Sequence, residues 1–209
     1  MAIFRNGYNH GKLGKTTTYP LNGVLVTRLI GKSTKPPTEL QKAVRLRTKI
    51  ISKFLFPVKE FIEVGYEREA RRRKQRSQNP AFSYNWQHAV TGKYPKLKIN
   101  FAKVLLSYGA MPPPVNLQVI SSDKGLIFSW GPQEGIAGTH WSDQVMLLAY
   151  FPKLKKSAYM TAGASRYKGT DLLVVFDIEH GHVAETYVAF VANDRKSISN
   201  SVYAGKIRW

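Results

Sequence analysis

The sequence contains no cysteine, few acidic residues and no long hydrophobic run. Without cysteine, no disulfide can stabilise the fold, and neither a cysteine nucleophile nor a cysteine-ligated metal site can form. Because no run of about 18 apolar residues occurs, we expect no membrane-spanning helix. The first residues, Met1 to Gly7, lack the apolar stretch of a secretion signal. We therefore expect a protein of the cytoplasm, or of a virion or ribonucleoprotein assembly.

Basic residues far outnumber acidic ones. The 209 residues include 32 Lys and Arg but only 13 Asp and Glu, which gives a net charge of +19. The resulting pI near 10.1 is typical of proteins that bind nucleic acid, although anionic membranes and acidic proteins are competing partners. Hydrophobic residues make up 43% of the chain, so we expect a packed core rather than disorder.

The excess of positive charge lies almost entirely in the first part of the chain. Residues 1–114 carry 22 basic and 5 acidic residues, whereas residues 115–209 carry 10 and 8. Met111 and the triple proline that follows it mark the change, and three prolines can continue neither a helix nor a central strand. We therefore predict a basic α+β domain over residues 1–110, a proline linker over 111–114 and a second domain over 115–209.

The basic part is predicted to contain a β-hairpin and a long kinked helix. Residues 6–35 are extended pieces between turn signals such as Asn6-Gly7, and Asn22-Gly23 favours a two-residue hairpin turn within Tyr19 to Ile30. Thr38 can cap a helix that starts at Glu39, and apolar residues recur at helical spacing from Leu40 onwards. Pro57 should kink this helix or divide it.

Two groups of cations in the basic part are candidate phosphate contacts. One group lies on the polar face of the predicted helix and consists of Lys42, Arg45, Lys49 and Lys53. The other is a run of five cations in six positions, namely Arg71, Arg72, Arg73, Lys74 and Arg76. Such a run is either the solvated end of a helix, or a phosphate-backbone contact or targeting tract. We favour the phosphate contact because the surrounding region is already strongly basic.

Aromatic residues alternate with cations after this run. Tyr84 and Trp86 are candidates for stacking on unpaired bases, but aromatic residues more often anchor a core. The partial alternation of apolar and polar residues from Lys96 to Leu106 predicts a strand.

Seven strand-like segments separated by turn residues follow residue 115. They predict an all-β antiparallel sandwich of immunoglobulin-like architecture. The segment Leu126 to Pro132 resembles the second strand of a fibronectin type III domain, and Glu185 to Asn193 resembles its sixth strand. By that resemblance, Trp130 and Tyr187 would be core anchors.

No catalytic motif or cofactor site is evident in the sequence. The segment from Gly11 to Thr16 superficially resembles a phosphate-binding loop, but Asn9 stands where that loop needs its first glycine. His180 and His182 flank a glycine and lack a third ligand at a recognisable zinc spacing, so we expect no metal site. We expect a protein that is not an enzyme, although a site assembled only in space stays possible.

The chain as a whole resembles an uncharacterised domain family found widely in Bacteroidota. The residues that carry this resemblance are Asn6-Gly7, Gly11 to Gly14, Gly23, Arg28, Lys35 to Thr38, Gln41, Arg45, Asn85, Lys103 to Gly109 and Asn200 to Gly205. The resemblance implies a Bacteroidota cell or one of its phages as the source, and it implies no activity.

The sequence therefore leads to two hypotheses about function. The first is a non-enzymatic structural protein of a virion, nucleoid or ribosome-associated assembly, whose basic part binds the phosphate backbone of DNA or RNA. The alternative is a protein-assembly or adhesion module that binds a protein or a surface through the β-sandwich, without nucleic acid.

Overall fold

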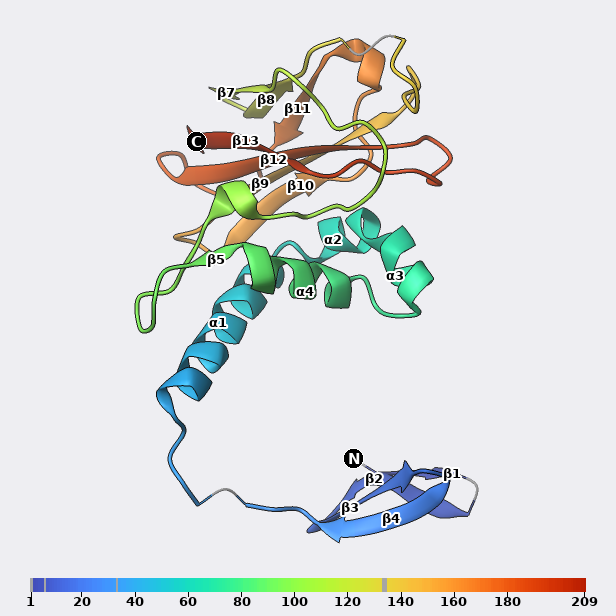
Figure 1. The fold of residues 1–209 in the computed structure, drawn as a ribbon. Helices are drawn as coiled ribbons and strands as arrows, with labels where there is room; N and C mark the ends of the chain where they lie inside the picture. The colour runs from blue at the N-terminus through green and yellow to red at the C-terminus, as the bar shows by residue number, and fades with distance from the viewer. Residues whose placement is uncertain (1, 6, 33, 133–134) are drawn as a thin grey trace. The chain divides into compact units, whose positions relative to one another are not determined.

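The computed structural model describes every residue except 1, 6, 33, 133 and 134 (Figure 1). The chain divides into two compact units, Met1–Thr38 and Glu39–Trp209. Both units contain antiparallel strands, and the larger unit adds helices, so the protein is a mixed α+β protein. Within the described part of the chain, none of the helices combines the length and the apolar character needed to cross a membrane.

The smaller unit is an antiparallel sheet in which each strand pairs with the next along the chain. Its strands are β1 (Ala2–Arg5), β2 (Tyr8–Leu13), β3 (Thr16–Leu21) and β4 (Val24–Leu29). Asn22 and Gly23 join β3 to β4 with φ values of 49° and 80°, as a two-residue hairpin turn requires. The predicted hairpin is therefore confirmed, whereas Asn6 of the predicted Asn6-Gly7 turn lies outside the described residues.

The smaller unit is basic and has little interior. It contains six basic residues and no Asp or Glu. Among its described residues, only Thr18 is buried. The Thr18 hydroxyl lies 2.8 Å from the hydroxyl of Thr27 on the neighbouring strand, and the Arg28 guanidinium lies 5.3 Å from the centre of the Tyr19 ring. Cross-strand contacts and backbone hydrogen bonds, rather than a core, stabilise this sheet.

Four helices are described in the larger unit. They are α1 (Glu39–Leu55), α2 (Lys59–Gly65), α3 (Glu67–Arg73) and α4 (Gln78–His88). Pro57 lies between α1 and α2, so the predicted division at this proline is confirmed. The aromatic segment that contains Tyr84 and Trp86 forms α4, which was not predicted as a helix. Pro80 lies in the first turn of α4, where no backbone N–H is needed.

The strand predicted from Lys96 to Leu106 is wrong over most of its length. Only β6 (Lys98–Ile99) forms, and it pairs with β5 (Val90–Thr91). A short 3-10 helix over Phe101–Lys103 follows it. The backbone then leaves the sheet, because the N–H of Leu105 and that of Leu106 donate to the side chains of Asn85 and Ser201 instead of to a neighbouring strand.

All seven strands predicted after residue 115 are present and form two antiparallel sheets. They are β7 (Gln118–Ser122), β8 (Gly125–Ser129), β9 (Gln144–Phe151), β10 (Lys156–Met160), β11 (Thr170–Val174), β12 (Val183–Val191) and β13 (Val202–Arg208). One sheet has the order β11-β8-β7 and the other the order β10-β9-β12-β13. Figure 1 shows the second sheet as the middle layer, between the helices and the first sheet.

The middle sheet is buried on both faces. On β9, Leu147 packs in a core with Phe128 of the outer sheet, whereas Leu148 packs in a second core with Phe54 of α1. Trp130 and Tyr187, the expected core anchors, are both buried, one in each core.

The predicted division at residues 111–114 differs from this arrangement. Those prolines lie inside the larger unit, and the division between the two compact units falls after Thr38. Helices before residue 111 and strands after residue 114 share the core that contains Phe54 and Leu148. The change in charge at residues 111–114 therefore reflects a change in surface composition and does not coincide with a boundary between the two compact units.

Candidate functional site

Four predicted phosphate contacts form a stripe along α1. Lys42, Arg45, Lys49 and Lys53 are spaced by three, four and four residues, which places them on one face of a helix. All four are exposed. We call these four residues the α1 basic stripe.

The opposite face of α1 packs against the rest of the unit. Ile51, Phe54 and Leu55 are buried there. Arg47 also points away from the α1 basic stripe, because its guanidinium donates to the backbone carbonyl of Val90 over 3.1 Å and lies 4.7 Å from the centre of the Trp86 ring. The helix therefore has one apolar face that anchors it and one basic face that is open to a partner.

The α1 basic stripe is only weakly neutralised within the chain. Lys42 donates to Glu39 over 2.9 Å, and this hydrogen bond raises the pKa of Lys42 above its ordinary value. Among the described residues, no carboxylate forms an ion pair with Arg45, Lys49 or Lys53. Their charges are available to an anion.

The cations of the run at residues 71–76 are more heavily paired. Arg71 forms an ion pair with Glu67, and Arg72 and Arg73 both donate to Glu69. Arg72 contacts both carboxylate oxygens of Glu69 at 2.8 Å, and these bonds are the largest cause of a Glu69 pKa lowered to about 2. Lys74 and Arg76 complete the run and are exposed. The run is thus a basic helix end in which three of five cations already have partners.

Tyr84 and Trp86 lie half-buried on α4. The Trp86 indole N–H donates to the Thr48 hydroxyl over 3.2 Å, and Arg47 lies over the Trp86 ring. The Tyr84 ring lies 4.6 Å from the His88 ring. Trp86 therefore fastens α4 to α1, since its contacts with Thr48 and Arg47 are both with α1.

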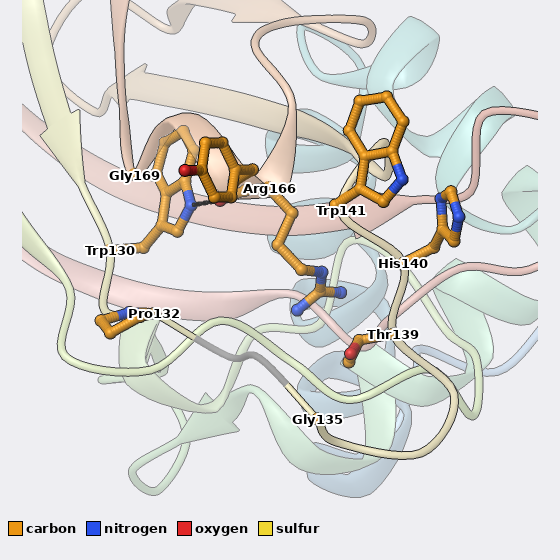
Figure 2. Close-up of a pocket in the computed structure, with 9 residues that line it drawn as sticks. Trp130, Pro132, Gly135, Thr139, His140, Trp141, Arg166 and Gly169 are labelled. Carbon is orange, nitrogen blue, oxygen red and sulfur yellow. Dashed lines mark hydrogen bonds between the residues drawn. The ribbon is translucent and has the colours of Figure 1, made fainter.

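A pocket of about 490 Å³ lies among loops of the two-sheet region and was not predicted (Figure 2). Residues of the β8–β9 connection and of the segment between β10 and β11 line it. In Figure 2, Trp130 lies on one side of Arg166, and Trp141 and His140 lie on the other. Trp141 and Tyr167 are 66% and 73% exposed, although side chains of this size usually bury most of their surface.

A buried ion pair stabilises the floor of the pocket. Arg166 Nε donates to Asp143 Oδ2 over 3.1 Å, and the guanidinium lies 3.8 Å from the centre of the Phe190 ring. Burial lowers the pKa of Arg166 from its ordinary value, and the nearby Asp143 opposes that shift. The Trp130 indole N–H donates to the Arg166 carbonyl over 2.7 Å, so one aromatic wall is fixed to the floor.

The loop residues of the pocket come from segments far apart in the sequence. An aromatic residue in a loop, such as Trp141 beside His140, is the only signal that could have marked this site in advance. Trp141 lies beside Tyr167 and Arg166 only in the folded chain, so this arrangement could not be predicted from the sequence.

The histidine pair at residues 180 and 182 forms a strand connection rather than a cluster of ligands. The His180 ring stacks on the Trp209 ring at 4.1 Å, and the Trp209 N–H donates to the His182 carbonyl over 2.8 Å. Among the described residues, no three His, Asp or Glu side chains gather closely enough to hold a metal ion.

Several residues that carry the family resemblance contact the segment 104–109, which we call the strap and of which residues 104–107 are buried. The Asn85 side chain accepts from the Leu105 N–H over 3.0 Å and donates to the Leu105 carbonyl over 2.8 Å. The Ser201 hydroxyl accepts from the Leu106 N–H over 2.8 Å, and the Asn200 side chain accepts from the Gly109 N–H over 3.1 Å. These residues therefore have a structural role, which is to join α4, the strap and the segment before β13.

The fold and its surface define a basic, mostly antiparallel α+β protein with an exposed cationic helix face. The chain belongs to DUF6266, a family of unknown function that matches residues 8–205. The predicted membership of an uncharacterised domain family is thus confirmed at this level. No curated protein matches the chain.

Proposed function

We propose that this protein is a non-enzymatic structural component of a nucleic-acid assembly, in the cytoplasm or within a virion or ribonucleoprotein particle. The observation that carries the proposal is the α1 basic stripe, which presents four exposed cations on one face of the helix, opposite an anchored apolar face, and of which only Lys42 forms an ion pair among the described residues. At a rise of about 1.5 Å per residue, the stripe is roughly 16 Å long. It is long enough to meet several successive phosphates of a DNA or RNA backbone.

The bound polymer is recognised through its charge. Lysine and arginine contacts to phosphates position a protein on nucleic acid but carry no sequence information. Binding should therefore show little sequence preference and should weaken steeply with salt. The paired cations of the run at residues 71–76 give a smaller contribution, because Glu67 and Glu69 compete with the phosphates for Arg71, Arg72 and Arg73.

A salt titration of binding to duplex DNA and to single-stranded RNA tests the proposal. Replacing Arg45, Lys49 and Lys53 together with Gln should reduce the slope of log affinity against log salt by roughly 2–3, at about 0.7–0.9 per lost phosphate contact. The matched control replaces Lys124, Lys153 and Lys206, three exposed lysines of the near-neutral part, and should leave the slope unchanged. Equal losses in both triple variants, or a flat salt response of the natural chain, would overturn the proposal.

We further infer that the two sheets after residue 115 form an immunoglobulin-like sandwich. The first, second and fifth strands of this region lie in one sheet, and the third, fourth, sixth and seventh lie in the other. Seven antiparallel strands in two sheets that share one core support this inference, as does the resemblance to fibronectin type III strands. A source in Bacteroidota or their phages rests on the sequence resemblance alone.

The aromatic pocket favours a second candidate function, that of a protein-assembly or adhesion module. Exposed Trp and Tyr side chains are typical of binding surfaces. In this case the basic residues would contact an acidic protein or a membrane surface.

The two functions differ in what accompanies the purified protein. Nucleic acid that nuclease removes supports the first, whereas a clean preparation that binds acidic vesicles or an acidic protein supports the second.

A further inference from the structure

The pocket among the loops of the two-sheet region has walls that are stabilised independently of any ligand. Trp130 is fixed by its hydrogen bond to the Arg166 carbonyl and packs edge-on against Phe190, with ring centres 5.7 Å apart. The backbone N–H of Tyr167 donates to the Trp141 carbonyl over 3.2 Å, so the two loops that carry the exposed aromatic rings are joined directly. Figure 2 shows Trp130 and Trp141 on opposite sides of the Arg166 side chain.

The pocket offers aromatic surface together with a few hydrogen-bonding groups. Within the described part of the chain, the Trp141 indole N–H and the Tyr167 hydroxyl have no hydrogen-bond partner. His140 Nδ1 is engaged by Ser142, whose hydroxyl lies 2.6 Å away and whose N–H lies 3.3 Å away, so Nε2 is the ring nitrogen that faces a ligand. Flat apolar rings with a small number of donors between them are the usual composition of a site for a small organic molecule.

The charge of the pocket points to a neutral ligand. Arg166 is the only Lys or Arg among the described lining residues, and Asp143 neutralises it at 3.1 Å. The nearby Lys168 lies 3.9 Å from Asp171. A strand of nucleic acid would bring phosphates to a place where the described lining residues offer no surplus cation, and single-strand sites combine aromatic stacking with a basic groove.

From these observations we propose that the pocket binds a neutral carbohydrate of one or two pyranose rings. The C–H face of a pyranose ring is apolar and packs on an aromatic ring, while its hydroxyls can accept from the Trp141 N–H and form hydrogen bonds with His140 and Tyr167. A volume of about 490 Å³ accommodates a ligand of this size. A proline-rich peptide would need an extended groove lined by aromatic residues rather than a compact pocket. This inference is independent of the phosphate-binding function proposed above.

Cellobiose is the probe that tests this proposal, because its β-linked glucose rings present apolar C–H faces on both sides. The full chain is titrated with cellobiose up to about 50 mM, well above a millimolar Kd, while the indole N–H signals are followed by NMR. The Trp141 signal, assigned from the Trp141→Phe variant, should move in a saturable manner. Trp141→Ala and Tyr167→Ala should each weaken binding at least tenfold.

Phe176→Ala is the matched control, because Phe176 is a 76% exposed aromatic residue outside the pocket lining. It should bind cellobiose as the natural chain does. The proposal fails if cellobiose moves no indole signal saturably, or if Trp141→Ala binds it unchanged. It also fails if a hexaproline peptide or thymidine, titrated in the same way, saturates the Trp141 signal and cellobiose does not.

Discussion

Leu147 and Leu148 are neighbours on β9, and their side chains lie in two different hydrophobic cores. Leu147 packs with Phe128 and Phe190 between the two sheets, whereas Leu148 packs with Phe54 and Ile62 of the helices. Successive side chains of a strand point to opposite faces of its sheet, so a single strand joins both cores. The helical layer and the outer sheet are therefore coupled through the middle sheet.

This coupling predicts one cooperative unfolding transition for the larger unit. Leu148→Ala and Leu147→Ala should each lower the free energy of unfolding by about 2–5 kcal/mol, because each leaves a cavity in a packed core. In both variants, the helix signal in far-ultraviolet circular dichroism and the tryptophan fluorescence should change together during denaturation. Val174→Ala, at a 39% exposed position of β11, should change the stability by much less. Separate transitions for helices and strands would contradict the prediction.

The strap at residues 104–109 predicts that Gly109 cannot be replaced. A Cβ atom on Gly109 would lie 2.0 Å from the carbonyl oxygen of Ile198, which is part of the backbone and cannot rotate away. Gly109→Ala should therefore lower the free energy of unfolding by about 3 kcal/mol, the upper part of the range for overpacked sites.

Gly31→Ala is the control for this variant. A Cβ atom on Gly31 would meet no atom within 4 Å. Its effect on stability should stay within about 0.5 kcal/mol, as for other open surface positions. Urea denaturation of the three proteins measures both effects, and equal stabilities of Gly109→Ala and Gly31→Ala would contradict the proposed role of the strap.

The elements that could be predicted from the sequence are those set by local chemistry. The Asn22-Gly23 turn, the break at Pro57 and the seven strands after residue 115 depend on turn residues, on proline and on short apolar runs. The α4 helix was missed because its segment was interpreted through Tyr84 and Trp86 alone, as candidates for stacking on bases or for anchoring a core. Tertiary contacts support α4, including the Arg47 guanidinium over Trp86 and the bonds from Asn85 to the strap.

The rest depends on contacts between distant segments. The boundary at the triple proline was inferred from charge. The β9 residues Val145–Phe151 form a continuous apolar run, which is typical of a strand covered on both faces, and this run indicates that a further layer packs on the sheet. The spacing of Lys42, Arg45, Lys49 and Lys53 could be read as one face of a helix. The pairing of Arg72 and Arg73 with Glu69 could not be predicted in the same way. Glu69 lies three and four residues before these arginines, but how strongly it holds them against an external phosphate depends on the burial of Glu69 in the folded chain.

Glu69 predicts how the stability of the protein depends on acid. Hydrogen bonds from Arg72 and Arg73 hold the pKa of this buried carboxylate at about 2, below its ordinary value of 4.5. A carboxyl group whose pKa is lower in the folded than in the unfolded state stabilises the fold above its ordinary pKa. This stabilisation is lost as the pH falls from about 4.5 towards 2, because the unfolded chain takes up the proton first.

The free energy of unfolding, measured by urea denaturation at a series of pH values, should therefore fall through this window in the natural chain. In Glu69→Gln the fall should be shallower, since the amide does not titrate, whereas Glu60→Gln at an exposed position should follow the natural curve. Parallel curves for the natural chain and Glu69→Gln between pH 4.5 and 2 would show that the arginine pairs at the end of α3 do not stabilise the folded state.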